Sequence, residues 1–317
     1  MKRKQIIHII EWVVALAACG YLVWRLATYD DYVSLFAELR EMDIAQWGAL
    51  VASVLLMPVN MTIEAWRWRT LMNEGESRVE SQESIGWGEA HRQVYYSKLA
   101  GLITPWRLGE YPARGLLMQK ESLSQEIEQV SSKTLWTKVL TMGAVGSATM
   151  TIAIVIGGLT GLAMAGSPVD LGNNYIIILL GVLIGAIVLI AAGWKIRTVL
   201  LSSYSSPSVH RRLTVGIICK NILQSIVRLL CWCVQLGLLL YALDALTGIT
   251  EITALTAIYY LLVTITPNVP IAEIGVRGAW AIAVFGTPQA AIAAVVLWVI
   301  NTLLPCATWF FLRKKKE

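Results

Sequence analysis

Charged side chains are scarce in this sequence of 317 residues: 15% are Asp, Glu, Lys or Arg, whereas 56% are hydrophobic. The mean hydropathy of +0.61 is far above that of a chain with a solvated globular surface. This composition excludes a disordered chain, a nucleic-acid-binding domain and an ordinary cytosolic enzyme. It predicts an all-α, polytopic membrane protein in which residues 1–317 form a single integral membrane domain.

Motifs of several enzyme classes are absent as well. The sequence has no P-loop, no Asp-x-Asp metal pattern, no His pair at metal-ligand spacing and no G-x-S-x-G elbow. Its five cysteines all lie in apolar stretches, where free buried thiols are the usual state. We therefore expect no metal, no cofactor and no ATP hydrolysis within this chain.

Six apolar blocks are long enough to cross a bilayer, which takes roughly 20 helical residues. These expected full spans cover residues 6–27, 47–66, 134–163, 174–194, 213–243 and 287–312. The loop 195–212 is basic, as is the carboxyl-terminal tail, whereas the segment 28–46 is acidic. By the positive-inside rule, both termini are expected on the cytoplasmic side.

Two further apolar segments, about 88–117 and 252–285, are interrupted by similar motifs. The first reads TP-x4-E-x3-RG from Thr104 and the second TP-x5-E-x3-RG from Thr266, and a double tyrosine precedes each. Prolines remove helical donors and glycines tolerate unusual dihedral angles, so each segment is expected to break into two half-helices. The residues expected to cause the breaks are Pro105, Gly109, Pro112, Pro267, Pro270 and Gly275.

In the expected topology, the two broken segments are re-entrant hairpins that enter the membrane from opposite sides. Paired broken segments of this kind indicate a transporter binding site near the bilayer midplane. Arginines in the motifs suit a phosphate group, and each Glu lies four residues before an Arg, so the two can form an ion pair on a helix. The predicted substrate-binding residues are Arg107, Glu110, Arg114, Glu273 and Arg277.

Two alternatives stay open at this stage. The ion pairs would equally serve to clamp the hairpins without any ligand, and each hairpin can instead be two full crossings, which raises six spans to ten. Secondary candidates for the site are Lys98, Lys220 and Arg228. Lys220 and Arg228 belong to a polar stripe that either faces a wet cavity or lies on a helix extending past the membrane surface. The cluster Trp66–Arg69 is typical of an interface anchor.

The motifs also resemble those of a known family. The stretch YYSKLAGLITPWRLGEYPARGLL, followed by TPNVPIAEIGVRG, is similar to the two signatures of the transmembrane region of lysylphosphatidylglycerol synthases and of their stand-alone flippase-like relatives. Trp106 stands where the family commonly has glycine, and Gly278 where it commonly has an acid. The resemblance implies translocation of a phospholipid in the bacterial inner membrane. The aminoacyl-transferase domain of the bifunctional relatives is not expected within these residues.

The main hypothesis is therefore a lipid translocase whose partner is a membrane phospholipid or a lipid-linked anionic headgroup. A membrane-embedded enzyme with Glu110 or Glu273 as general base is the first alternative. A non-catalytic membrane scaffold, in which the polar groups of both motifs are dispensable, is the second. The sequence predicts no nucleic-acid partner and does not define the oligomeric state, the headgroup or the energy source.

Overall fold

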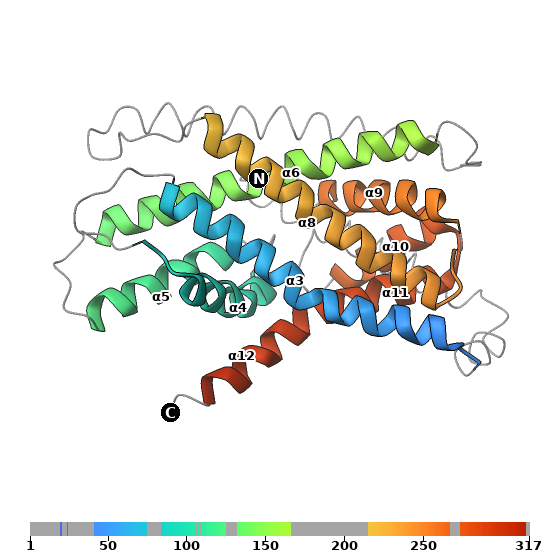
Figure 1. Ribbon diagram of the computed structural model, residues 1–317, viewed down its shortest axis with the longest axis horizontal. Helices are drawn as coiled ribbons and strands as arrows, with labels where there is room; N and C mark the ends of the chain where they lie inside the picture. The colour runs from blue at the N-terminus through green and yellow to red at the C-terminus, as the bar shows by residue number, and fades with distance from the viewer. Residues whose placement is uncertain are drawn as a thin grey trace. The chain divides into compact units, whose positions relative to one another are not determined.

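The computed structural model describes residues 41–74, 84–104, 107, 109–124, 132–165, 215–246, 248–266 and 273–314, together with Gly20 and Trp24. In this part of the chain every regular element is helical, which confirms the all-α prediction. The elements shown in Figure 1 are α3 (Ile44–Glu74), α4 (Trp87–Ile103), α5 (Glu110–Ser124), α6 (Ser132–Ala165), α8 (Val215–Ala242), α9 (Ile249–Ile265), α10 (Glu273–Phe285), α11 (Pro288–Trp298), the π-helical turn η4 (Val299–Leu303) and α12 (Leu304–Lys314).

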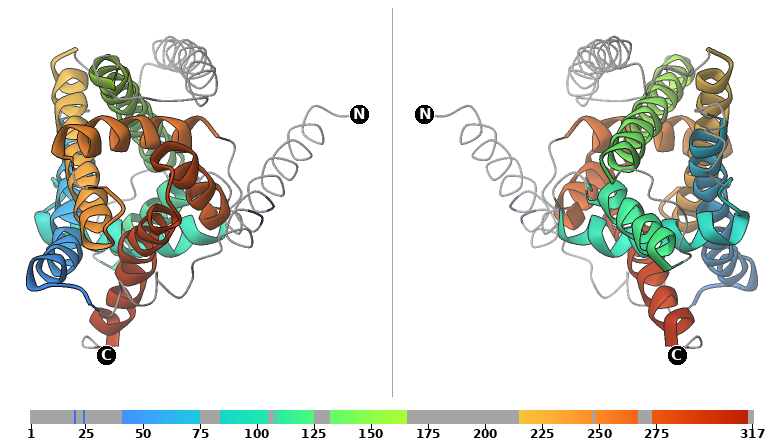
Figure 2. Two further views of the ribbon diagram at one scale, coloured as in Figure 1. Left: turned by 90° about the vertical axis from the view of Figure 1, so that its right-hand side faces the viewer. Right: turned by 90° about the vertical axis from the view of Figure 1, so that its left-hand side faces the viewer.

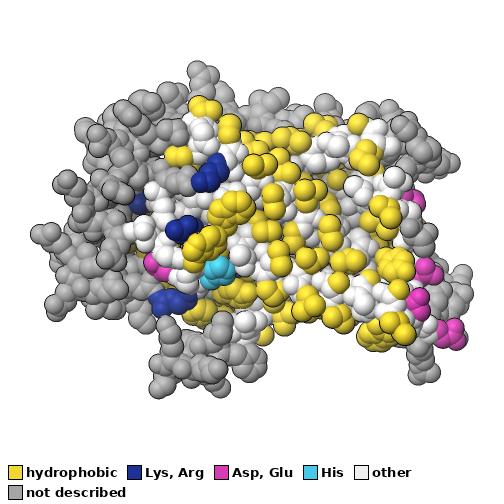
Figure 3. Space-filling view, in the orientation of Figure 1, with side chains coloured by type: hydrophobic (Ala, Val, Ile, Leu, Met, Phe, Trp, Pro, Cys, Tyr) yellow, Lys and Arg dark blue, Asp and Glu magenta, His cyan; other side chains and the backbone are white. Residues whose placement is uncertain are grey.

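Within the described part of the chain, four helical stretches are long and apolar enough to cross a membrane. They are Ile44–Asn73, Leu135–Met164, Val215–Ala242 and Pro288–Trp309, and each overlaps one of the spans expected from the sequence. The expected spans 6–27 and 174–194 lie outside the described residues, apart from Gly20 and Trp24. Hydrophobic side chains cover much of the described surface in Figure 3, as a lipid environment requires.

The chain divides into two compact units. Unit 1 comprises Met1–Pro58, Ile154–Ala186 and Leu230–Leu304, and unit 2 comprises Val59–Ala153, Ile187–Leu229 and Pro305–Glu317. In unit 2, α4 packs against α5, and in unit 1, α10 packs against both α9 and α11 (Figures 1 and 2). Each interrupted segment of the sequence therefore folds as two packed helices on either side of a break.

Close helix packing in unit 1 depends on two glycines of α6. A Cβ atom at Gly158 would lie 2.6 Å from Leu261, and one at Gly161 would lie 2.6 Å from the carbonyl oxygen of Ala254, both on α9. Glycines at a spacing of three thus let the backbones of α6 and α9 approach, as small residues commonly do between membrane helices. This contact fixes the first half of the second broken segment against a long apolar helix.

Unit 1 also contains a small network of amide side chains. The Asn301 side chain, within η4, donates to Gln235 Oε1 of α8 at 3.0 Å. Gln235 in turn exchanges hydrogen bonds with Ser53 of α3, donating to its backbone carbonyl at 3.0 Å and accepting from its hydroxyl at 3.2 Å. Because such groups find no water in hydrocarbon, their mutual hydrogen bonds keep α3, α8 and η4 in register within this unit.

Candidate functional site

The two breaks are built around the threonines of the TP motifs. Thr104 ends α4 and Thr266 ends α9, and each hydroxyl donates to the carbonyl oxygen four residues earlier, at 2.9 and 2.7 Å. Each hydroxyl also accepts a hydrogen bond from the second half of its segment. The donor to Thr104 is the backbone amide of Gly109 at 2.8 Å, and the donor to Thr266 is Trp280 Nε1 at 2.8 Å. The threonines of the two motifs thus make similar hydrogen bonds, each to its own helix and to the second half of its segment.

The residues expected to break the helices take different positions. Gly109 lies within the first break, where an added Cβ would meet the Thr104 side chain at 2.7 Å. Pro112 and Gly275 lie in the first turns of α5 and α10, just after the breaks. A proline is tolerated there because the first amides of a helix have no partner within the helix. Pro105, Pro267 and Pro270 lie outside the described residues.

The glutamates of the two motifs each begin a helix, Glu110 in α5 and Glu273 in α10. A carboxylate in the first turn interacts favourably with the positive end of the helix dipole. The predicted pairs with the arginines four residues later are confirmed. Arg114 Nη2 lies 3.5 Å from Glu110 Oε2, and Arg277 Nη2 lies 2.8 Å from Glu273 Oε1.

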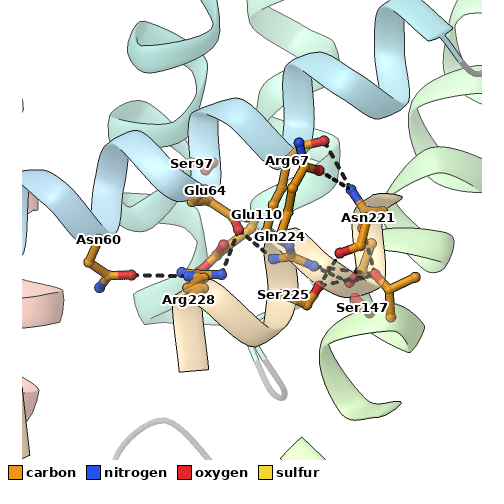
Figure 4. Close-up of polar contacts among 12 residues, drawn as sticks. Asn60, Glu64, Arg67, Ser97, Glu110, Ser147, Asn221, Gln224, Ser225 and Arg228 are labelled. Carbon is orange, nitrogen blue, oxygen red and sulfur yellow. Dashed lines mark hydrogen bonds and ion pairs between the residues drawn. The ribbon is translucent and has the colours of Figure 1, made fainter. Parts of the chain in front are cut away.

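In unit 2, the centre of the site is Glu64, a residue of α3 in the middle of the polar contacts drawn in Figure 4. Its Oε1 accepts from Arg114 at 2.9 Å, and its Oε2 accepts from Arg67 at 2.7 Å and from Arg228 at 2.5 Å. Glu64, Arg67, Arg114 and Arg228 are all buried. One carboxylate thus joins guanidinium groups from α3, α5 and α8, with every charge-assisted hydrogen bond removed from solvent.

Glu110 extends this cluster through Lys98 of α4. The Lys98 ammonium lies 2.9 and 3.0 Å from the two carboxylate oxygens of Glu110, and both residues are buried. Gly101, one turn further along α4, makes room for this contact, because a Cβ there would lie 2.8 Å from Glu110 Cγ. Arg107, in the break, is half-buried, has φ 54°, and is near enough to Lys98 and Glu110 to interact electrostatically with both.

Arg114 also lies against aromatic rings. Its guanidinium carbon is 4.8 Å from the ring centroid of Trp68 and 5.3 Å from that of Tyr111. The Tyr111 hydroxyl is 2.7 Å from Ser147 Oγ of α6, and Arg114 Nε donates to Ser97 Oγ of α4 at 3.2 Å. Cation–π contacts and hydrogen bonds together fix this side chain, which is 0% exposed.

A second layer of uncharged polar groups surrounds the arginines. Arg67 Nη2 donates to the backbone carbonyl of Gly146 in α6 at 2.7 Å. Asn221 of α8 donates to the Arg67 carbonyl at 3.3 Å and accepts from Thr149 at 2.6 Å, and Gln224 donates to Thr70 at 2.9 Å. These contacts, several of which are visible in Figure 4, connect α3, α6 and α8 within unit 2.

The second motif forms a smaller site in unit 1. Arg277 donates to Glu273 Oε1 from both Nε, at 3.0 Å, and Nη2, at 2.8 Å. The side chain of Arg277 is 19% exposed, against 1% for that of Arg114. Tyr259 and Tyr260, the double tyrosine of this segment, are buried nearby, and the Tyr259 ring packs against Phe285 of α10 at 5.8 Å. Among the residues that the structure describes, this site contains one ion pair, of Glu273 with Arg277.

The predicted residues therefore fall into separate places. Glu110, Arg114, Lys98 and Arg228 meet around Glu64 in unit 2, with Arg107 beside them. The other two predicted residues, Glu273 and Arg277, pair with each other in unit 1. Lys220 is exposed, whereas Gln224 and Arg228 on the same polar stripe are buried.

Sequence reasoning missed the roles of Glu64 and Arg67. Arg67 was expected at an interface as part of the cluster Trp66–Arg69, but Arg67 and Trp68 are 4% and 1% exposed, and only Trp66 of the two tryptophans is exposed. The helical spacing of these residues indicates that they share a buried face. Glu64, Arg67 and Trp68 are three and four residues apart, so a helix places them on one face, with Trp66 pointing elsewhere.

Comparison with known proteins agrees with these motifs. No curated protein is significantly similar to the chain. The family model of the lysylphosphatidylglycerol synthase TM region matches residues 12–309, nearly the whole sequence. The match includes both broken segments and all four long apolar stretches. The chain therefore belongs to the lysylphosphatidylglycerol synthase transmembrane-region family, and it is a multi-pass membrane protein related to lipid handling.

Proposed function

We propose that this protein is a lipid translocase, which moves a phospholipid or a lipid-linked anionic headgroup across the bacterial cytoplasmic membrane. The observation that carries the proposal is the buried ionic cluster around Glu64. Glu64 and Arg67 lie in the apolar helix α3 and Arg228 lies in the apolar helix α8, both long enough to cross a membrane. Charges at that depth are costly and usually mark a substrate or ion pathway.

The residue chemistry supports an anionic headgroup. Arginine presents several N–H donors in a planar arrangement that matches phosphate oxygens, and it stays charged when buried. Of the motif arginines Arg107, Arg114 and Arg277, the first two are the proposed headgroup ligands, and the third is proposed to act in the movement of the second hairpin. Glu110 and Glu273 hold two of them at the start of a helix, 3.5 and 2.8 Å away. The acyl chains would remain in the bilayer while the headgroup passes through the protein.

In this proposal, the segments that contain the breaks are the ones that move during translocation. The two segments 88–117 and 252–285 act as re-entrant hairpins of opposite orientation, and both chain termini are cytoplasmic, as the distribution of basic loops favours. A rocking movement of one hairpin would then expose the headgroup to one side and afterwards to the other. The equivalent roles of Thr104 and Thr266 support treating the hairpins as related halves.

The experiment is a translocation assay with the purified full chain in proteoliposomes. Fluorescent phosphatidylglycerol, aminoacylated phosphatidylglycerol and phosphatidylcholine are compared in the wild type, Arg107→Ala and Arg277→Ala. We expect the wild type to move an anionic or aminoacylated lipid and both variants to move it more slowly. Folded wild-type protein that moves none of these lipids would contradict the proposal and favour a membrane-embedded enzyme or a scaffold.

A further inference from the structure

The cluster in unit 2 carries more positive than negative charge. Two carboxylates, Glu64 and Glu110, lie among five cations, each of which forms an ion pair or interacts electrostatically with one of the two. The cations are Arg67, Lys98, Arg107, Arg114 and Arg228. Counted over the described residues of this cluster, positive charges outnumber carboxylates by three, and by two when only the four cations in ion pairs are counted. A buried excess of charge is unfavourable unless an anion neutralises it.

Two of these arginines also keep unused hydrogen-bond donors. Arg114 Nη1 and Arg67 Nε are buried and have no acceptor among the residues that the structure describes. Arg114 is 0% exposed and Arg67 is 4% exposed. A buried N–H of a guanidinium without an acceptor loses its hydration and gains nothing in return. An oxyanion that reaches these two groups would supply both the missing acceptors and the missing negative charge.

The corresponding site of unit 1 differs in charge, and the buried group there without a hydrogen-bond partner among the described residues is the neutral Tyr259 hydroxyl rather than a guanidinium N–H. Arg277 gives two hydrogen bonds to Glu273, and one arginine there matches one carboxylate. The side chain of Arg277 is partly exposed, at 19%. Although the two motifs share their capping threonines and their Glu–Arg spacing, the surplus of positive charge among the described residues lies around the motif of unit 2.

From these differences we infer that unit 2 alone forms the phosphate site, at the Glu64 cluster, and that Glu64 and Arg67 belong to it. The inference rests on the proposed function and sharpens it, since Arg277 then has no direct role in holding the phosphate. Half-buried Arg107 is the most accessible of the five cations, since the other four are buried. Glu64 is a positioning residue, because it holds Arg67, Arg114 and Arg228 in one place.

The test compares two matched variants, Arg114→Gln and Arg277→Gln, because each arginine pairs with a glutamate four residues earlier. Binding to the purified full chain is measured by calorimetry and by thermal melting, in a neutral detergent. The probes are inorganic phosphate and a short-chain phosphatidylglycerol, and sodium chloride at equal ionic strength is the control for screening. Circular dichroism and elution as a single species establish that each variant is folded.

We expect the wild type and Arg277→Gln to bind a probe with the same affinity within about twofold, and Arg114→Gln to bind about tenfold more weakly or not at all. Binding of inorganic phosphate would show that the free oxyanion is sufficient, and binding of phosphatidylglycerol alone would show that the site needs the lipid headgroup. Both results support the inference. If Arg114→Gln does not fold, Arg67→Gln takes its place with the same expectation.

Equal loss of binding in Arg277→Gln and Arg114→Gln would overturn the inference, as would a folded wild type that binds neither probe. Detergent binding and vesicle translocation are separate measurements, so the two proposals can fail independently. A wild type that binds phosphate through Arg114 but moves no lipid would contradict the proposed function and leave the phosphate site in place. A wild type that moves lipid but needs Arg277 for phosphate binding would contradict the site.

Discussion

Arg114 and Glu64 are separated by 50 positions in the sequence, yet the Arg114 guanidinium donates to the Glu64 carboxylate at 2.9 Å in a buried contact. This contact joins the first broken segment to the apolar helix α3. Through it, the first TP motif joins the ionic cluster around Glu64. Glu64 itself lies outside the motif, so the motif does not reveal this partner of Arg114.

Neutralising Glu64 should destabilise the protein strongly. In Glu64→Gln three buried arginines lose their shared carboxylate, and breaking buried ion pairs on one side costs about 3–5 kcal/mol. The free energy of unfolding in detergent, from denaturant titration, measures the effect. Glu41→Gln is the matched control, because Glu41 is exposed and its loss should change stability by less than about 0.5 kcal/mol. Equal stability of the two variants would contradict the role of Glu64.

The contact between Glu64 and Arg228 should show strong coupling in a double-mutant cycle. Each single variant, Glu64→Gln or Arg228→Gln, leaves a buried charge with one partner fewer, whereas the double variant removes both members of the pair. We expect the double variant to be more stable than the sum of the single effects by about 1–3 kcal/mol. Unfolding of all four proteins under one condition measures the coupling, and additive effects would mean that the two groups do not interact.

Gly101→Ala should disturb the contact between Lys98 and Glu110. The new Cβ would lie 2.8 Å from Glu110 Cγ and 2.9 Å from its Oε1, so the carboxylate must move away from the lysine. Such overpacking is expected to lower the free energy of unfolding by about 1–3 kcal/mol. Gly88→Ala, in the same helix, is the control, since nothing lies within 4 Å of its Cβ. A higher melting temperature for Gly88→Ala and a lower one for Gly101→Ala would meet the prediction.

Thr266→Val should weaken the second break. The hydroxyl of Thr266 both donates to Leu262 and accepts from Trp280 Nε1, and the valine can do neither. Thr253 of the same helix makes only the first type of bond, to Ile249 at 2.7 Å, so Thr253→Val measures that part alone. We expect Thr266→Val to lower the free energy of unfolding by about 1 kcal/mol more than Thr253→Val does. Identical melting curves would show that the bond to Trp280 contributes nothing.

Local features of the fold were predictable from the sequence. Hydrophobic blocks located the long apolar helices, and the spacing of four predicted the pairs of Glu110 with Arg114 and of Glu273 with Arg277. Both depend on helical periodicity and chain length, which are local properties.

The convergence on Glu64 was not predictable, because it depends on how α3, α5 and α8 pack together. The sequence gives the face on which Glu64 lies but not which helix meets that face. Trp68 illustrates the difficulty, since a tryptophan between basic residues is typical of an interface, whereas here its ring lies 4.8 Å from the Arg114 guanidinium. A charged residue in an apolar helix points to a partner without identifying it.

The most direct test of the account is the rate at which the purified full chain moves fluorescent phosphatidylglycerol between leaflets of proteoliposomes, measured by dithionite quenching. Wild type and Arg114→Gln are compared at equal amounts of folded, reconstituted protein. The account predicts that the wild type transfers inner-leaflet lipid to the outer leaflet, where it is quenched, and that Arg114→Gln slows this transfer by about tenfold or more. Transfer at the same rate in both proteins, or none in the wild type, would contradict it.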